Sequence, residues 1–164
     1  MPTVATMATS KLRTMLTGEN GIAFSAAQLV QGEPDLTVAA FPVAVMASTL
    51  PLDLAERSPV TYPSVQVSCE KLSNTLREKF RTFSGKAHLV VEIRASSAHA
   101  GPTEDSLQLY TQSVLQVLHR NRGDWGGGMF YGGGYEVSFA PVRRGGSNFL
   151  QIARVSLALD VCID

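Results

Sequence analysis

The side chains best suited to chemistry are two cysteines and three histidines. A thiol and an imidazole can act as the nucleophile and general base of a hydrolase, and Cys69 with His88 or His99 is the pairing that this chain offers. Cys69, however, stands in a run that alternates with valines, which places it on the inward side of a strand. A reactive thiolate needs an exposed, electropositive setting. The sequence therefore predicts no catalytic residues and no enzyme activity.

Metal and cofactor sites also lack a signature. The three histidines are far apart in the sequence, and none belongs to the paired Cys/His spacing of a zinc site. Cys69 and Cys162 are predicted to be reduced thiols in strands. The run Gly123–Gly134 contains seven glycines, but it lacks the Walker lysine and precedes a strand, whereas a phosphate-binding loop precedes a helix. No metal and no cofactor are expected.

The same glycine-rich segment, Gly123–Gly134, is the most function-like part of the chain. Four large apolar side chains stand among its glycines: Trp125, Met129, Phe130 and Tyr131. The glycines predict a mobile loop, and aromatic side chains are enriched at interface hot spots because their exposure is costly. These four residues are therefore candidate partner contacts, together with Arg143 and Arg144 in the turn that follows. The alternative is that the segment folds back onto the chain's own sheet.

A strand and a helix must form the framework that positions these residues. Lys86–Ser97 alternates apolar and polar side chains, which predicts a half-buried β-strand. Gly101-Pro102 is expected to break the chain. Thr103–Arg120 is then predicted to be an amphipathic helix with Thr103 as its N-cap, an apolar stripe from Leu107 to Leu118, and cations in its last turn.

Further strands and helices are predicted around this pair. Alternation predicts strands at Ser64–Glu70, Tyr135–Pro141 and Phe149–Ile163, the last two forming an antiparallel hairpin. The long final strand is expected to outrun its partner and to offer an edge to another chain. Apolar residues at helical spacing predict a short helix or a helical turn over Lys71–Phe83, and a first helix that ends near Thr17, before Gly18.

The segment 22–63 is apolar and interrupted by prolines, which are unfavourable inside helices and central strands. It is predicted to be an irregular arm or loop region, with a helical turn at Leu52–Arg57. Residues 1–164 are predicted to form a single α+β domain whose core is 64–164. Its mostly antiparallel β-sheet packs against one long and one or two short helices.

The composition favours protein partners. The chain has 14 basic and 14 acidic residues and no net charge, so no basic surface is evident for phosphate contacts, and no sequence-specific nucleic-acid binding is expected. Charged residues make up 17% of the chain, against about 25% in an ordinary soluble domain. No apolar run approaches the ~20 residues of a membrane span, so a membrane role is not expected either.

The order of elements resembles that of bacteriophage tail terminators, small α+β proteins that cap a finished tail tube. The resemblance runs from about Val65 to the C-terminus. It rests on the run LREKFRTFSGKAHLVVEIRAS, the helix after it, and the pair GGYEVSFAPV and FLQIARVSLALDV. It implies a homohexameric ring that contacts the tail tube protein and the head connector or stopper proteins. It also implies a place in the virion neck, and in the host cytoplasm during assembly.

Two alternatives remain open at this point. One is another neck component, such as a stopper or an adaptor. The other is a small ligand-binding α+β domain whose pocket lies beneath the Gly123–Gly134 segment.

Overall fold

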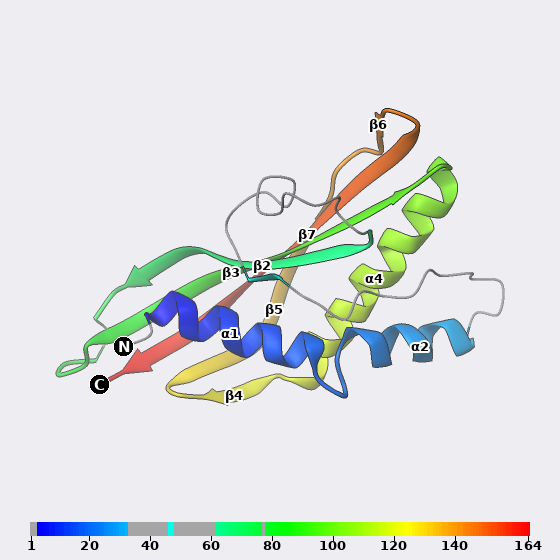
Figure 1. Cartoon of the computed structure of the whole chain (residues 1–164). Coiled ribbons are helices and arrows are strands. Elements are labelled where there is room, and N and C mark those ends of the chain that lie inside the picture. Colours follow the sequence, from blue (N-terminus) through cyan, green and yellow to red (C-terminus); the bar gives the residue numbers. More distant parts are fainter. Residues whose placement is uncertain (1–2, 33–45, 48–61, 77) are drawn as a thin grey trace.

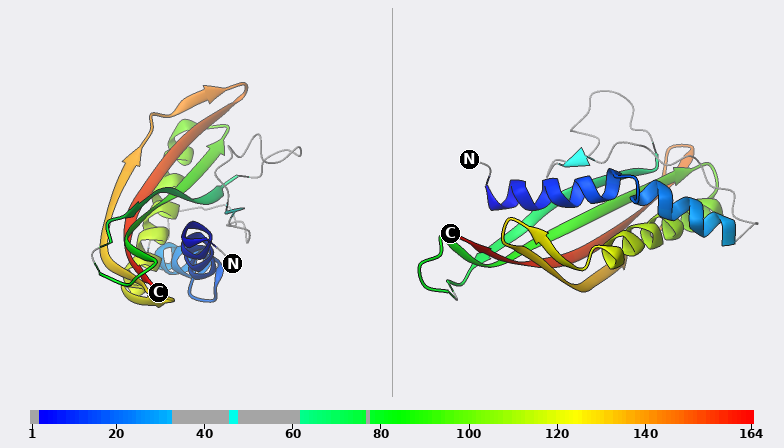
Figure 2. Two further views of the ribbon diagram at one scale, coloured as in Figure 1. Left: turned by 90° about the vertical axis from the view of Figure 1, so that its left-hand side faces the viewer. Right: turned by 90° about the horizontal axis from the view of Figure 1, so that it is seen from below.

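The computed structural model of the chain describes residues 3–32, 46–47, 62–76 and 78–164. Helices lie against one face of a curved sheet (Figures 1 and 2), which confirms the predicted α+β class. The helices are α1 (Val4–Thr17), α2 (Ile22–Gly32) and α4 (Ala100–Arg120). The strands are β1 (Met46–Ala47), β2 (Ser64–Asn74), β3 (Phe83–Ser97), β4 (Gly123–Gly126), β5 (Met129–Phe139), β6 (Arg143–Gly145) and β7 (Asn148–Ile163).

The strands follow the order β1-β2-β3-β7-β5-β4, and β6 also pairs with β7. All pairs are antiparallel except β1 with β2. β7 lies inside the sheet: it pairs with β3 from Phe83 to Ser97 on one side and with β5 and β6 on the other. The expectation that the final strand offers a free edge is therefore wrong, because β3 pairs with the side of β7 that a simple hairpin would leave open, from Phe149 to Ile163.

The alternation in β3 separates two faces of the sheet. Ala87, Leu89, Val91 and Ile93 are buried on the inner face, which the helices cover. The outer face carries the ion pair Lys86–Asp160 between the neighbouring strands β3 and β7, the pair Arg154–Glu70 that reaches across β3 from β7 to β2, and the pair Arg94–Glu92 within β3. Such a division is usual for antiparallel sheets, where one face packs on the core and the other meets solvent.

The first helix ends where the sequence predicts. Thr3 is the N-cap of α1, and its Oγ1 accepts a hydrogen bond from the amide of Thr6 at 3.2 Å. The helix ends at Thr17, before Gly18. Its buried side chains, Ala8, Leu12 and Leu16, pack against β2 and β3.

The long helix α4 begins earlier than expected. It starts at Ala100 with His99 as N-cap, so Gly101-Pro102 lies inside its first turn and does not break the chain. Proline fits there because the first amides of a helix have no intrahelical acceptor. Thr103 is consequently not the N-cap. Its buried hydroxyl donates to the carbonyl of His99 at 2.8 Å.

Two further predictions of local structure are wrong. Residues 22–32 of the predicted irregular segment form helix α2, whereas 33–45 and 48–61, with the predicted turn at Leu52–Arg57, lie outside the described residues. The predicted helix over Lys71–Phe83 is instead the end of β2, a turn and the start of β3. A β-bulge between Cys69 and Lys71 interrupts the alternation of β2, so Leu72 returns to the register of the inner face opposite Ala87.

Candidate interaction surfaces

The glycine-rich segment is an ordered hairpin. β4 pairs with β5, and Gly123 lies opposite Tyr131. The three glycines of the turn, Gly126, Gly127 and Gly128, all have positive φ, between 64 and 80°. L-residues with side chains rarely adopt this conformation, so the glycines permit a tight connection. The prediction of a mobile loop is therefore wrong.

Three of the four large apolar side chains in this hairpin belong to the chain's own core. Met129 is 0% exposed and Tyr131 is 1% exposed, while Trp125 is also buried. The Trp125 indole Nε1 donates to the carbonyl of Asn121 at 2.6 Å, and its ring lies 5.6 Å from that of Tyr131. The expectation that these three residues contact a partner is wrong, because a partner cannot reach buried side chains. Phe130 lies opposite Asp160 and is 50% exposed, so its contact with a partner stays a prediction.

Helix α1 holds this hairpin in place. The ammonium of Lys11 donates to the carbonyl of Trp125 at 2.9 Å. Among the residues that the structure describes, β5 is the strand that pairs with β4. A lysine over an edge strand hinders pairing with another chain, so this side of the sheet is protected.

The two turn arginines lie at the far end of β7. Arg143 and Arg144 belong to the short strand β6 and are exposed. Arg143 stands at the rim of a groove of about 380 Å³ between β3, β5, β6 and β7, which we call the groove. Its apolar lining is Phe139, Ala140, Pro141, Leu150 and Ile152. Contact of Arg143 and Arg144 with a partner stays a prediction.

The turn between β2 and β3 carries exposed apolar residues that the sequence analysis did not single out as contacts. In this turn (residues 75–76 and 78–82, called the tip), Phe80 is 99% exposed and Leu76 is 58% exposed. Both have positive φ, 70° for Phe80 and 48° for Leu76. Their helical spacing predicts a buried helix face, so the sequence did not identify them as exposed side chains.

Polar groups fix the base of the tip. Asn74 Oδ1 accepts hydrogen bonds from the amides of Leu76 and Ser84, at 3.4 and 3.1 Å. Arg81 pairs with Glu78 and with Asp164 near the end of β7. The base of the tip is therefore held by polar contacts within the chain, while Leu76 and Phe80 are exposed to solvent.

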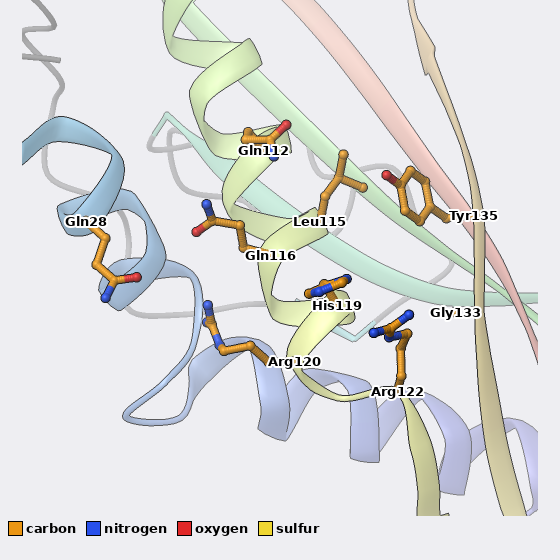
Figure 3. Close-up of a pocket in the computed structure, with 9 residues that line it drawn as sticks. All are labelled: Gln28, Gln112, Leu115, Gln116, His119, Arg120, Arg122, Gly133 and Tyr135. Carbon is orange, nitrogen blue, oxygen red and sulfur yellow. The ribbon is translucent and has the colours of Figure 1, made fainter. Parts of the chain in front are cut away.

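A polar depression of about 470 Å³ lies between α2, α4 and β5 (Figure 3). Gln28, Gln112, Gln116, His119, Arg120, Arg122 and Tyr135 are among its lining residues, and no carboxylate is. Arg122 lies against Gly133, where a side chain would collide with it. Arg120 contacts helix α2: its guanidinium donates to Ser25 Oγ at 2.6 Å and lies 5.5 Å from the ring centre of Phe24.

The cysteines and histidines are not brought together. Cys69 lies in the inner-face register opposite Leu89, whereas His88 points to the outer face opposite Lys71. Burial raises the pKa of the Cys69 thiol, which disfavours the reactive thiolate. His99 lies beyond the other end of β3. Both thiols are free, and the described part of the chain contains no cluster of His, Cys, Asp or Glu suited to a metal ion.

Comparison with other proteins adds no assignment. No protein-family model matches the chain, and no curated protein matches it. Among the described residues, none of the helices combines the length and the apolar character needed to cross a membrane.

Proposed function

We propose that the chain is a ring-forming structural subunit of the neck of a tailed phage, a tail terminator that caps the tail tube. The observation that supports this proposal best is the placement of large exposed apolar side chains at opposite ends of one sheet. Leu76 and Phe80 lie at the tip, and Phe139, which is 49% exposed, lines the groove. Exposure of these apolar side chains to water does not stabilise a monomer.

Burial in an assembly would make both ends favourable. Transfer of a leucine or phenylalanine side chain from water to a packed interface contributes roughly 1.5–3 kcal/mol. A subunit with one such surface forms pairs, whereas a subunit with two different surfaces can form a closed ring. The α+β fold and the resemblance of residues 65–164 to tail terminators favour the ring, and a homohexamer is the form that this resemblance implies.

The same proposal includes the partners and the location. The ring contacts the tail tube protein on one side and head connector or stopper proteins on the other, in the virion neck, after assembly in the host cytoplasm. It performs no catalysis and holds no cofactor. Zero net charge suits a ring through which DNA passes, because strong phosphate contacts would retain the genome.

Native mass spectrometry and electron microscopy test this function. The purified chain, alone or mixed with tail tubes that lack their terminal protein, should give ring-shaped density, and the tubes should stop growing. A chain that remains monomeric in every mixture and leaves tube length unchanged would exclude it. Rings that bind only isolated head connectors would instead indicate a stopper or an adaptor.

The polar depression favours a second function, binding of a small anionic ligand by a monomer. His119 and Arg122 line it without a carboxylate, and three glutamines, Gln28, Gln112 and Gln116, also line it (Figure 3). Titration with inorganic phosphate and with citrate, followed by NMR chemical shifts of these residues, tests this candidate. Saturable shifts that disappear in an Arg122→Gln variant would support it, and unchanged spectra at millimolar ligand would exclude it.

A further inference from the structure

We propose that the polar depression binds a small phosphate monoester, and that a glycine bulge in β5 positions Arg122 to contact its phosphate group. This inference rests on the second function proposed above, ligand binding by the depression. It names the class of ligand and the residues that select it. Ring assembly neither requires nor excludes it.

The bulge lies in the middle of β5. The pairing of β5 with β7 shifts between Tyr131 and Tyr135, so that Gly132–Gly134 stands opposite the single residue Ala158. Bulges redirect side chains and are frequent beside active sites. Glycine inside a strand also marks a place where another group approaches the backbone closely. The bulge therefore points to a close contact at this place in β5.

Arg122 makes this close contact. Gly133 has a φ of 102°, and a Cβ built on it would lie 2.6 Å from Arg122 Cδ and 3.3 Å from Arg122 Cγ. The stem of the arginine thus lies where a side chain at position 133 would stand. The neighbouring Gly132 and Gly134 have open space at the same position. In Figure 3 the guanidinium of Arg122 lies between Gly133 and His119, at the depression that both residues line.

Three donor groups line this side of the depression. Arg122 offers a planar fork of N–H groups, His119 an imidazole and Tyr135 a phenol hydroxyl. Figure 3 shows the ring of Tyr135 reaching from β5 toward α4. All three residues are exposed, and within the described part of the chain none of their side chains has a hydrogen bond or an ion pair. A ligand can therefore contact all three without breaking an existing contact.

The charge of the depression selects an anion. Its cationic residues are His119, Arg120 and Arg122, and none of the described residues that line it is a carboxylate. Arg120 already donates to Ser25 Oγ and to the carbonyl of Asn20, so Arg122 is left for a ligand. A guanidinium fork binds phosphate and carboxylate groups through two parallel hydrogen bonds.

A phosphate monoester fits these donors better than a carboxylate. It has three terminal oxygens, one each for the guanidinium, the imidazole and the phenol, whereas a carboxylate has two. The depression, of about 470 Å³, lies in the size range of pockets for small organic ligands, so it has room for more than the phosphate. Gln28, Gln112 and Gln116 also line it, and their amides can exchange hydrogen bonds with hydroxyl groups.

Isothermal titration calorimetry with glycerol 3-phosphate tests the site, with malonate and inorganic sulfate as comparison ligands. The wild type should bind glycerol 3-phosphate more tightly than malonate, which lacks a third oxygen on each acid group, and more tightly than sulfate, which lacks the hydroxyls. Arg122→Lys keeps the charge but loses the fork, so it should weaken binding about tenfold or more. Tyr135→Phe should weaken it about two- to tenfold, as expected for one neutral hydrogen bond.

Gly133→Ala tests the bulge, and Gly132→Ala is its matched control. Alanine at position 133 collides with the stem of Arg122, so binding should weaken about as much as in Arg122→Lys. Alanine at position 132 has open space and should leave the affinity unchanged. If Gly133 acts through Arg122, Gly133→Ala should cause no further loss of affinity when it is added to Arg122→Ala. Circular dichroism checks that each variant folds, and if Gly133→Ala does not, Arg122→Lys and Tyr135→Phe carry the test.

The results separate this inference from the function on which it rests. No saturable binding of any of the three ligands at millimolar concentration would overturn both. Malonate bound as tightly as glycerol 3-phosphate, or an unchanged affinity in Arg122→Lys, would overturn the phosphate site and leave a less selective anion site. Equal affinities in folded Gly133→Ala and Gly132→Ala would overturn the role of the bulge.

Discussion

Replacing Met129 with alanine should separate a core hairpin from a mobile one. The Met129 side chain is 0% exposed and lies in the sheet opposite Val161. Truncation of a buried methionine costs about 2–5 kcal/mol of unfolding free energy, through lost transfer energy and the cavity left behind. Domains of this kind are stable by only about 5–15 kcal/mol, so the loss is a large fraction of the total.

Phe130→Ala is the matched control. Phe130 follows Met129 in the same strand, but its side chain points to the other face and is half exposed. Its truncation should change the unfolding free energy by less than about 1 kcal/mol, in the range of surface and β-propensity effects. The two variants differ by one position in sequence and by the face of the sheet they alter.

Urea unfolding followed by far-UV circular dichroism measures both changes. Fluorescence provides a second, local probe, because Trp125 is the only tryptophan and lies in this hairpin. For a chain of this length, 1 kcal/mol shifts Tm by about 2–4 °C, so Met129→Ala should lower Tm by about 4–20 °C. Equal losses in the two variants, or a loss below about 1 kcal/mol for Met129→Ala, would refute the packing of this hairpin in the core.

Two other predictions concern stability. Burial raises the pKa of Tyr110 to about 12, so between pH 10 and 12 the unfolded chain releases this proton and the folded chain keeps it. The unfolding free energy should therefore fall as pH rises through this range in urea titrations, and less steeply in Tyr110→Phe. Gly128→Ala should destabilise the chain by about 1–3 kcal/mol, because Gly128 has a φ of 80° and its added Cβ would meet the carbonyl of Cys162. Gly132→Ala, with open space around it, should differ little from the wild type in the same urea experiment.

The parts of the fold that follow from the sequence are those with an uninterrupted period. β3 and β7 alternate over their whole length, and α4 keeps its apolar stripe, so each was predicted close to its observed bounds. β2 was predicted only as far as Glu70, because the bulge there shifts the alternation by one residue. Helix α2 was missed because it adjoins the proline-rich segment, although Gly32 and Pro34 mark its end.

The candidate contacts were predicted less well, for a related reason. Met129 and Tyr131 alternate with Phe130 as in a strand, but the flanking glycines favour a loop in a prediction from sequence. In the structure the positive φ angles of Gly126, Gly127 and Gly128 form the turn of a hairpin whose Met129 and Tyr131 are buried. Leu76 and Phe80 show the opposite case. Their i, i+4 spacing predicts burial on a helix, yet three apolar positions are too few to establish a period. Exposure at a strand turn depends on tertiary structure, which spacing alone does not report.

The interior position of β7 has a consequence for synthesis on the ribosome. β3 is translated before β7, its partner on one side, which follows about 50 to 80 residues further along the chain, so this pairing is strongly non-local. Until Ile163 has emerged, one side of β3 has an unpaired row of amides and carbonyls beside a largely apolar face. Unpaired strands of this kind associate with other chains. During translation, β3 is therefore prone to mispairing, although it ends up as one of the most deeply buried strands of the described structure.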